Sequence, residues 1–392
     1  MWRLLRKTMN SFSQTLPGII FSFLFLCSCS NTSNNNNLGS QNMAIPIPEE
    51  NIDKFSEVFN KVNYITVQLP LESSIGQADK VIITEDNIFI GDFYQNPKVI
   101  ILDKEGNFLS CINAFGEGPG EYTQINDFVI HHEDPKVLIL STKKILAFDF
   151  NGNFVEELDR PISGGYKFLA TKKDELIFYV PPNISSADPK HGDNILFSYE
   201  NQKVHPFFTS KFMEEKIPFF ADRNILVYLD NKTFFTKHFS DTIYVFEGKE
   251  LKEKMYLDFE NSRKLKLNIF QEHDSNILNN LEYMQDYVYH MPNLHLSGKY
   301  LVTCFREKNY RSTLLYNRTK KTSKSISNAT NDLDGLLPYL NVKYLSNNTL
   351  ISVHYPDEFI TIEQMENSDH PLLESLQQET VSFVFAIYQI KD

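Results

Sequence analysis

A recurring turn motif constrains the fold more than any other feature of the sequence. The pattern Asp-x-x-Gly-Asn-Phe spans residues 103–108 and returns at residues 149–154, 46 positions later. Its Asp can accept hydrogen bonds from the turn backbone, and its Gly supplies the positive φ of a three-residue hairpin loop with a bulge. A weaker copy surrounds Gly248, 96 positions beyond Gly152. Each copy predicts a tight connection between antiparallel strands.

Pairs of strand-like apolar runs recur together with these turns. Their starts are spaced by 39 to 67 residues. The first strand of each pair begins near one of six positions: Ile88, Val137, Leu176, Thr233, Tyr300 and Thr349. Repeats of about 40–50 residues with four strands each are typical of β-propeller blades, which bury their faces only against neighbouring blades. The sequence therefore predicts an all-β, six-bladed β-propeller over residues 48–392; a two-sheet sandwich with irregular strands is the alternative.

The two ends of this region are both strand-like, over residues 62–69 and 381–390. Pairing them in one blade would remove an exposed sheet edge, so we expect the ring to close in this way.

Two helical segments are also expected. Ile52, Phe55, Phe59 and Val62 have helical spacing after Pro48 and predict a short N-terminal helix. Similar spacing predicts a helical insertion near residues 268–289.

The N-terminus has the features of an export signal. Basic residues precede an apolar run over residues 16–28, which is shorter than the roughly 20 residues of a spanning helix. The run ends Leu26-Cys27-Ser28-Cys29, which resembles a bacterial lipobox. We therefore expect residues 1–28 to be a lipoprotein signal peptide, Cys29 to be lipidated, and residues 29–47 to form a flexible tether. A plain signal peptide with incidental cysteines is the alternative.

The charge balance of the chain excludes one class of partner. The chain carries 38 Lys and Arg against 50 Asp and Glu, for a net charge of −12, whereas nucleic-acid binding needs clustered positive charge. Nucleic acid is therefore not expected as a partner.

Cys111 and Cys304 both lie in strand-like sequence and are either a disulfide pair or two buried thiols.

One stretch carries a resemblance to a known family. Residues 115–122, Phe-Gly-Glu-Gly-Pro-Gly-Glu-Tyr, and the following residues 125–130 resemble the six-bladed, NHL-like β-propeller lipoproteins of Bacteroidetes. That family usually has a basic residue where this chain has Glu117. The resemblance implies a propeller fold and a lipid-anchored position in the cell envelope, but no reaction. We expect the outer membrane to be the membrane that carries the anchor. No acidic run resembling a surface-export signal follows Cys29, which favours a periplasm-facing protein.

No local motif predicts catalysis or a cofactor. The glycine-rich segment lacks a following helix and a Gly-Lys-Ser/Thr sequence, so it is not expected to hold phosphate. The histidines lack metal-ligand spacing, and no Gly-x-Ser-x-Gly is present. We therefore expect neither a metal nor another cofactor.

Propeller topology indicates where a ligand would bind. Loops between blades and loops between second and third strands share one face, and this face would carry Asp92, Tyr94, Glu121 and Tyr122. Aromatic rings beside hydrogen-bonding groups suit glycan or peptide recognition, so these four residues are the candidate ligand contacts, with residues 116–122 expected at the channel mouth. The sequence favours a non-catalytic envelope lipoprotein that binds a protein, peptide or glycan. The alternative is a lyase or hydrolase acting on glycans or peptides at the channel mouth.

Overall fold

A computed structural model describes residues 41–392, except 132–133, 173–174, 186–187, 210–223, 260–263, 266–283, 309, 338, 360–369 and 379. Cys29 and the expected signal peptide lie outside the described residues. Within the described part of the chain, no helix is long and apolar enough to cross a membrane.

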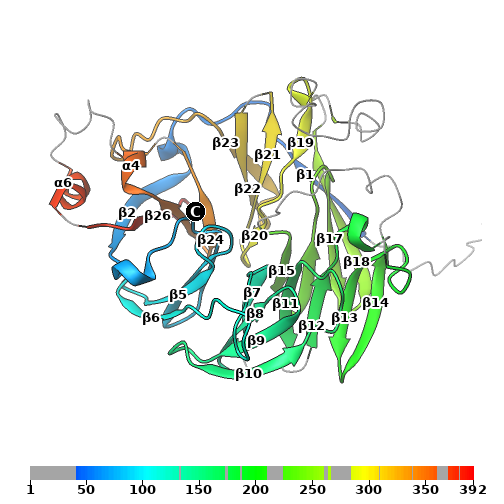
Figure 1. Ribbon diagram of the computed structural model, residues 1–392. Helices are drawn as coiled ribbons and strands as arrows, with labels where there is room; N and C mark the ends of the chain where they lie inside the picture. Colours follow the sequence, from blue (N-terminus) through cyan, green and yellow to red (C-terminus); the bar gives the residue numbers. More distant parts are fainter. Residues whose placement is uncertain are drawn as a thin grey trace, which may run out of the picture. The chain divides into compact units, whose positions relative to one another are not determined.

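Six antiparallel sheets follow one another along the chain as the blades of a β-propeller (Figure 1). Blade 1 contains β3 (Lys80–Ile83), β4 (Asn87–Asp92), β5 (Lys98–Asp103) and β6 (Phe108–Ile112). Blade 2 contains β7 (Asp127–His131), β8 (Lys136–Leu140), β9 (Lys144–Phe148) and β10 (Phe154–Asp159). Blade 3 contains β11 (Lys167–Lys172), β12 (Glu175–Tyr179), β13 (Asn194–Glu200) and β14 (Lys203–Thr209).

Blades 4 and 5 each carry one additional strand, and blade 6 combines strands from both ends of the propeller. Blade 4 contains β15 (Leu226–Leu229), β16 (Lys232–Phe235), β17 (Thr242–Glu247) and β18 (Glu250–Asp258), with β1 (Gln41–Pro46) at its outer edge. Blade 5 contains β20 (His295–Leu296), β21 (Tyr300–Glu307), β22 (Tyr310–Asn317) and β23 (Thr322–Ile326), and β19 (Val288–His290) also pairs with β21. Blade 6 contains β24 (Val342–Leu345), β25 (Thr349–His354), β26 (Phe383–Ile390) and β2 (Phe59–Val67). The short helices are the 3-10 turns Phe55–Glu57 and Leu71–Ser73, and α1 (Pro182–Ser185), α4 (Pro356–Phe359) and α6 (Pro371–Gln378).

The first strand of each blade faces the centre of the ring. Neighbouring inner strands contact one another in the order β7, β11, β15, β20, β24 and β3, so they line a central channel. The six strand starts read from the sequence fall at or within one residue of β4, β8, β12, β16, β21 and β25, the second strands of the six blades. The six-bladed propeller is confirmed, and the sandwich alternative is wrong.

The hydrophobic core lies between blades. One cluster joins Phe89 and Ile101 of blade 1 to Phe128 and Ile139 of blade 2, and further clusters fill other interblade spaces. Because both faces of the middle strands are covered, β12 is buried along its whole length, whereas the outer strand β10 is exposed along its whole length. This explains why the middle strands read as continuous apolar runs rather than as alternating patterns.

The recurring turn has the predicted structure in both copies. The Asp103 carboxylate accepts hydrogen bonds from the Asn107 amide nitrogen and side chain, each at 2.8 Å, and Gly106 has φ +91°. Asp149, Gly152 and Asn153 repeat this arrangement between β9 and β10.

The ring closes within blade 6, as expected. Strand β2 from the N-terminal side pairs with β26 from the C-terminal end, so the blue and dark red strands lie side by side in Figure 1. The expected N-terminal helix is reduced to the 3-10 turn Phe55–Glu57, and Phe59 and Val62 belong to β2. Phe55 and Phe59 are four residues apart because both rings contact Tyr388 of β26, the first edge-on and the second tilted. Pairing of β2 with β26 overrides the local helical pattern.

Two further expectations need correction. Residues 41–46 are not tether but strand β1, which runs parallel to β18 and covers an otherwise open edge, with Ile45 fully buried. The expected helical insertion lies mostly outside the described residues. Val288, which the sequence pattern assigned to that helix, belongs instead to strand β19. Cys111 and Cys304 are free thiols in blades 1 and 5.

Candidate functional site

Asp92, expected as a ligand contact, organises the loop between β4 and β5. Its side chain is fully buried, and its two oxygens accept hydrogen bonds from backbone amides that include those of Gly76 at 2.8 Å and Gln95 at 3.0 Å. A carboxylate that accepts several amide hydrogens holds the surrounding chain in one conformation. The structure therefore places Asp92 inside the loop and not on the ligand-accessible surface.

Tyr94, in the same loop, does reach the surface and is 50% exposed. Its hydroxyl lies 2.6 Å from the hydroxyl of Tyr166, which immediately precedes β11. The tyrosine pair therefore connects a blade 1 loop with the entrance to blade 3. Burial of the two rings raises the pKa of both phenols, so both stay protonated at neutral pH.

Tyr122 lies in the core, contrary to its expected role as a ligand contact. It is only 1% exposed, and its hydroxyl lies 3.0 Å from the Pro97 carbonyl oxygen and 3.1 Å from that of Ile112. The contact with Pro97 shows that residues 116–122 lie on the same face as the 92–96 loop, as expected. The position at the channel mouth is wrong, because the Gly120 amide donates to Glu157 of the outer strand β10.

Glu121 explains why this segment is rich in glycine. Its carboxylate accepts a hydrogen bond from the Gly118 amide at 2.8 Å, and the loop closes around it. A Cβ on Gly116 would meet this carboxylate at 2.0 Å, and Gly120 has φ +75°, which favours glycine. The half-buried Glu121 therefore shapes the loop, and the motif is primarily a structural connection between blades.

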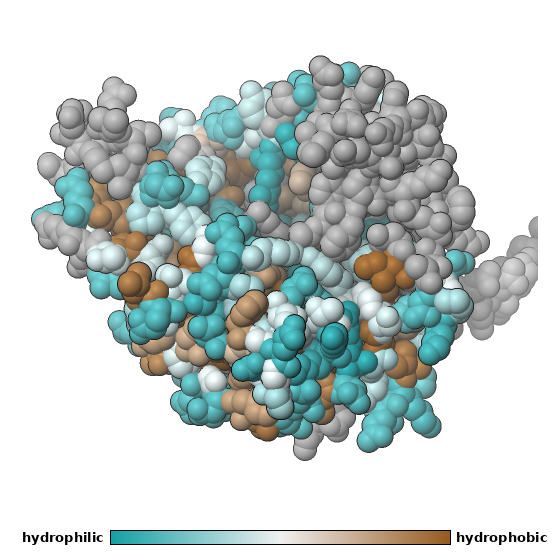
Figure 2. Space-filling view, in the orientation of Figure 1, coloured by the Kyte–Doolittle hydropathy of each residue, from teal (hydrophilic) through white to brown (hydrophobic). Residues whose placement is uncertain are grey.

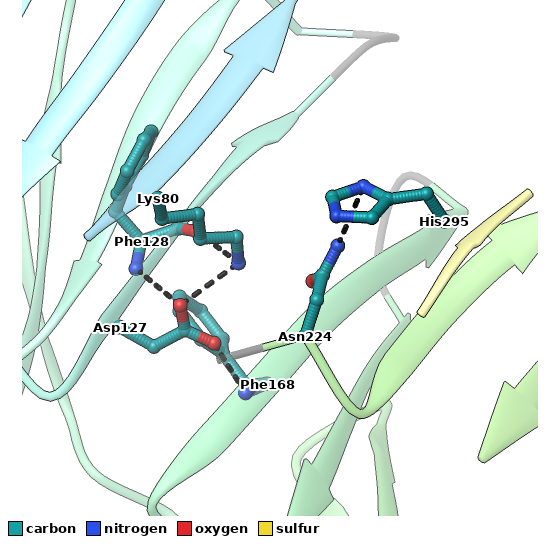
Figure 3. Close-up of polar contacts among 6 residues, drawn as sticks. All are labelled: Lys80, Asp127, Phe128, Phe168, Asn224 and His295. Carbon is teal, nitrogen blue, oxygen red and sulfur yellow. Dashed lines mark hydrogen bonds and ion pairs between the residues drawn. The ribbon is translucent and has the colours of Figure 1, made fainter. Parts of the chain in front are cut away.

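A belt of polar contacts at the channel mouth joins the inner strands (Figure 3). Lys80 of β3 pairs with Asp127 of β7, with Nζ and Oδ1 2.8 Å apart. The second oxygen of Asp127 accepts a hydrogen bond from the Phe168 amide of β11 at 3.1 Å. One buried carboxylate thus connects three consecutive blades.

The belt continues on the other side of the ring. The Asn224 amide lies 3.4 Å from Nδ1 of His295, and Asn293 donates to the Val342 carbonyl at 2.9 Å. Lys343 donates to the carbonyl of Ala78, which connects blade 6 to blade 1. Burial, with Lys343 nearby, lowers the pKa of His295 to about 3, so this imidazole is neutral at physiological pH.

A cavity of about 350 Å³ follows the channel and is lined by residues of all six inner strands. The cationic and imidazole side chains of its lining, Lys80, His295 and Lys343, lie at the belt together with Asn224. Tyr228 and Tyr344 are the other lining residues that carry a polar side-chain group. The rest of the lining is mostly aliphatic or aromatic, including Ile83, Ala170 and Leu345 at or near the far ends of their strands. The cavity therefore carries its cations at one end, whereas the other end is mostly apolar.

Lys167 adds a third cation beside this belt. It is 5% exposed, and its ammonium makes no hydrogen bond within the described part of the chain. Its ammonium lies 5.1 Å from the ring centroid of Phe93 and 5.3 Å from that of Tyr166. Burial lowers its pKa, while the charges of Asp127 and Asp79 oppose that effect. Cation–π contacts and two nearby carboxylates stabilise this desolvated charge.

Sequence reasoning missed Lys80, Asp127 and Lys167 because charged residues are numerous in this chain. A usable signal exists, since each of the three immediately precedes an apolar run that becomes an inner strand. Among the described residues, no group of three or more His, Cys, Asp or Glu side chains is placed to hold a metal ion.

The ring of six four-stranded blades around a channel defines this chain as a six-bladed β-propeller. It belongs to the family described as "Domain of unknown function (DUF4934)", whose model matches residues 42–381. A search of curated proteins found no match.

Two solved structures from Bacteroides share the fold. One is a Bacteroides fragilis protein named for its expected export, with a TM-score of 0.73 and 16% identity over 90% of this chain and 100% of that one. The other is a DUF4221 family member from Bacteroides vulgatus, with a TM-score of 0.52 and 11% identity over 85% of this chain and 99% of that one. At these identities the similarity shows the fold alone.

Proposed function

We propose that this protein is a lipoprotein of the cell envelope whose channel mouth binds a ligand without transforming it. The lipobox ending at Cys29 supports the anchor, and the name of the Bacteroides fragilis neighbour agrees with export. The outer membrane and a periplasm-facing orientation remain part of this proposal.

The observation that carries the binding proposal is the one-sided polarity of the channel cavity. Lys80, Lys343 and His295 gather at one end, and Lys167 lies beside them. Pockets for ligands typically combine apolar walls with a few convergent polar groups, as this cavity does. A ligand with a polar or anionic group would therefore place that group at the belt.

Binding without catalysis is supported by the state of two carboxylates at the mouth, those of Asp92 and Asp127. Asp92 accepts hydrogen bonds from backbone amides with both oxygens, and Asp127 is held by Lys80 and by the Phe168 amide. A general base needs an oxygen directed at the substrate. These two side chains are instead committed to the scaffold.

The ligand class in this proposal is a glycan, peptide or protein segment. Tyr94 and Tyr166 present aromatic rings beside the mouth, which suits sugar or peptide contact. On the face shown in Figure 2, hydrophobic side chains form small groups separated by hydrophilic ones. This mixed surface fits a polar ligand better than a broad apolar interface.

A ligand screen with the detergent-solubilised full-length protein tests the proposal. Glycan and peptide libraries should yield a ligand whose binding weakens about tenfold or more in Lys343→Gln or Tyr94→Ala. Glu156→Gln, on the exposed outer strand β10, is the matched control and should bind normally. Turnover of the ligand, or equal binding by all variants, would contradict the proposal.

A further inference from the structure

A second cavity, of about 630 Å³, lies between blades 5 and 6. It forms where β22 extends beyond its outer partner β23. Pairing between the two strands begins at Thr313, which lies opposite Ile326 at the end of β23. The first three residues of β22 therefore project past the end of β23. The chain then returns toward β24 through residues 339–341, which form the opposite wall. We call this cavity the blade 5–6 groove.

Arg311 is the charged side chain of the groove. Its Nη2 donates to the Cys304 thiol at 3.3 Å, which positions the guanidinium over the body of blade 5. Arg311 is exposed, and its side chain forms no ion pair and no other hydrogen bond within the described part of the chain. A guanidinium has five N–H donors, so most of them remain available to a ligand.

The rest of the groove presents short polar side chains and an aromatic ring. Its walls include two hydroxyls, two amides and a tyrosine: Thr313, Ser327, Asn328, Asn341 and Tyr339. Tyr339 is 42% exposed, and Tyr310, adjacent to Arg311, is 54% exposed. The aliphatic part of the lining is limited to Ile326 and Leu340. The groove thus combines one planar cation, neutral hydrogen-bonding groups and exposed rings.

We propose that the blade 5–6 groove binds the carboxylate of an acidic sugar, with Arg311 as the anion-binding residue and Tyr339 against the sugar ring. This inference rests on the proposed binding function and names its ligand class. A planar guanidinium matches a carboxylate with two parallel hydrogen bonds. The hydroxyls of Thr313 and Ser327 and the amide of Asn328 match the several hydroxyls of a sugar, whereas the Asn341 amide already donates to the Val353 carbonyl. A peptide carboxylate would make the same contact with Arg311, but a peptide has fewer hydroxyls to form hydrogen bonds with the neutral side chains of the groove.

The location also fits a ligand that extends to the channel mouth. Arg311 is close enough to His295 for its charge to act on that imidazole, and Leu340 and Asn341 lead directly into the inner strand β24. An oligosaccharide held at Arg311 would therefore extend toward Lys343 in β24. The blade 5–6 groove and the cavity at the belt then serve one chain-like ligand.

Calorimetry with defined oligosaccharides tests the inference. The full-length protein in detergent is titrated with trisaccharides of glucuronate, galacturonate and mannuronate, and with the same sugars after reduction of their carboxyl groups. We expect at least one uronate to bind and its reduced form to bind about 10- to 100-fold more weakly, as the loss of charge-assisted hydrogen bonds requires. Arg311→Gln should weaken uronate binding by a similar factor. Arg311→Lys should weaken it less, because a lysine retains the positive charge but cannot form two parallel hydrogen bonds to a carboxylate.

Controls separate this site from general charge effects. Lys324→Gln removes one exposed positive charge from β23 of the same blade and should leave uronate binding unchanged. Tyr339→Ala should weaken binding, with melting temperatures recorded for every variant. Failure of all three uronates to bind, or equal binding by Arg311→Gln, would overturn the inference. The same holds if a tripeptide with a free carboxylate binds in place of the sugars.

The two proposals fail in different ways. If library ligands bind at the channel mouth but Arg311→Gln has no effect on any of them, the groove assignment is wrong and the binding function stands. If no ligand binds the full-length protein at all, both are wrong.

Discussion

Lys80 and Asp127 form an ion pair across the joint between blades 1 and 2, with 2.8 Å between Nζ and Oδ1. The same carboxylate accepts the Phe168 amide of blade 3. The side chain of Asp127 is 2% exposed and that of Lys80 16%, so the pair is largely shielded from water. It therefore acts as a fixed part of the scaffold.

Replacing Asp127 should destabilise the whole ring. Asp127→Ala leaves the Phe168 amide without its acceptor and removes the carboxylate partner of Lys80, which keeps only the Phe128 carbonyl. Breaking a buried pair costs about 3 kcal/mol. Lys80→Met should cost less, because Asp127 keeps its amide donors. Urea unfolding of both variants measures the difference. A change below about 0.5 kcal/mol for Asp127→Ala would show that the belt contributes little to stability.

Deletion of residues 381–392 should abolish the cooperative unfolding of the entire propeller. Strand β26 lies between β25 and β2, so its loss opens the ring and exposes two strand edges. Calorimetry should show a lower and broader transition than in the full chain. Removal of Asp392 alone, which eliminates only an exposed contact with Lys299, is the control. An unchanged transition after the long deletion would contradict closure by β2 and β26.

Tyr122→Phe should reduce stability and leave ligand binding intact. The hydroxyl is the buried donor available to the Pro97 and Ile112 carbonyls, and an unsatisfied buried acceptor costs about 1–2 kcal/mol. Thermal unfolding and the ligand screen measure the two effects separately. Weakened binding with normal stability would restore Tyr122 as a ligand contact.

Acid should destabilise the protein through His290. Its Nδ1 faces the Ser240 carbonyl at 2.8 Å, so it carries the proton, and Nε2 accepts from the Thr303 hydroxyl at 2.8 Å. Burial lowers the pKa of His290 from 6.5 to about 4. The unfolded chain then takes up a proton near pH 6.5 while the folded chain stays neutral, so stability falls as pH drops from 6.5 to about 4.

The magnitude of this acid effect follows from the size of the pKa shift. A shift of this size corresponds to about 3 kcal/mol, present in full above pH 6.5. Urea unfolding at pH 7 and pH 4.5 measures it. His290→Gln removes the share of this histidine, while buried His295, whose pKa is also lowered, keeps its own share. If His290→Gln retains the pH dependence of the wild type, His290 is not its source.

Cys29→Ala should release the protein from the membrane fraction without unfolding it. Cys29 lies ahead of β1, which begins at Gln41, so the substitution leaves the described fold untouched. Fractionation of cells and a melting curve of the released protein are the measurements. A variant that stays in washed membranes would contradict the lipoprotein proposal.

The blade order could be predicted from the sequence because its signals are local. Asp103 with Asn107, and Asp149 with Asn153, form their turns from residues close in the chain, so composition and spacing suffice to place them. The second strands of the blades were placed correctly because burial on both faces demands apolar runs. Ile45 in β1 was missed because its partner strand lies about 200 residues away.

By itself, the sequence determined the all-β class, the number of blades, the turns and the pairing of the two chain ends, since each follows from repeat spacing and local turn chemistry. Only the tertiary structure decided which side chains form the candidate site. Tyr122 and Asp92 read as surface groups in the sequence but are buried, because long-range packing places backbone acceptors and donors around them. Lys80, Lys167 and Lys343 meet at the channel mouth only because ring closure brings blades 1, 3 and 6 together, and no local pattern encodes that convergence.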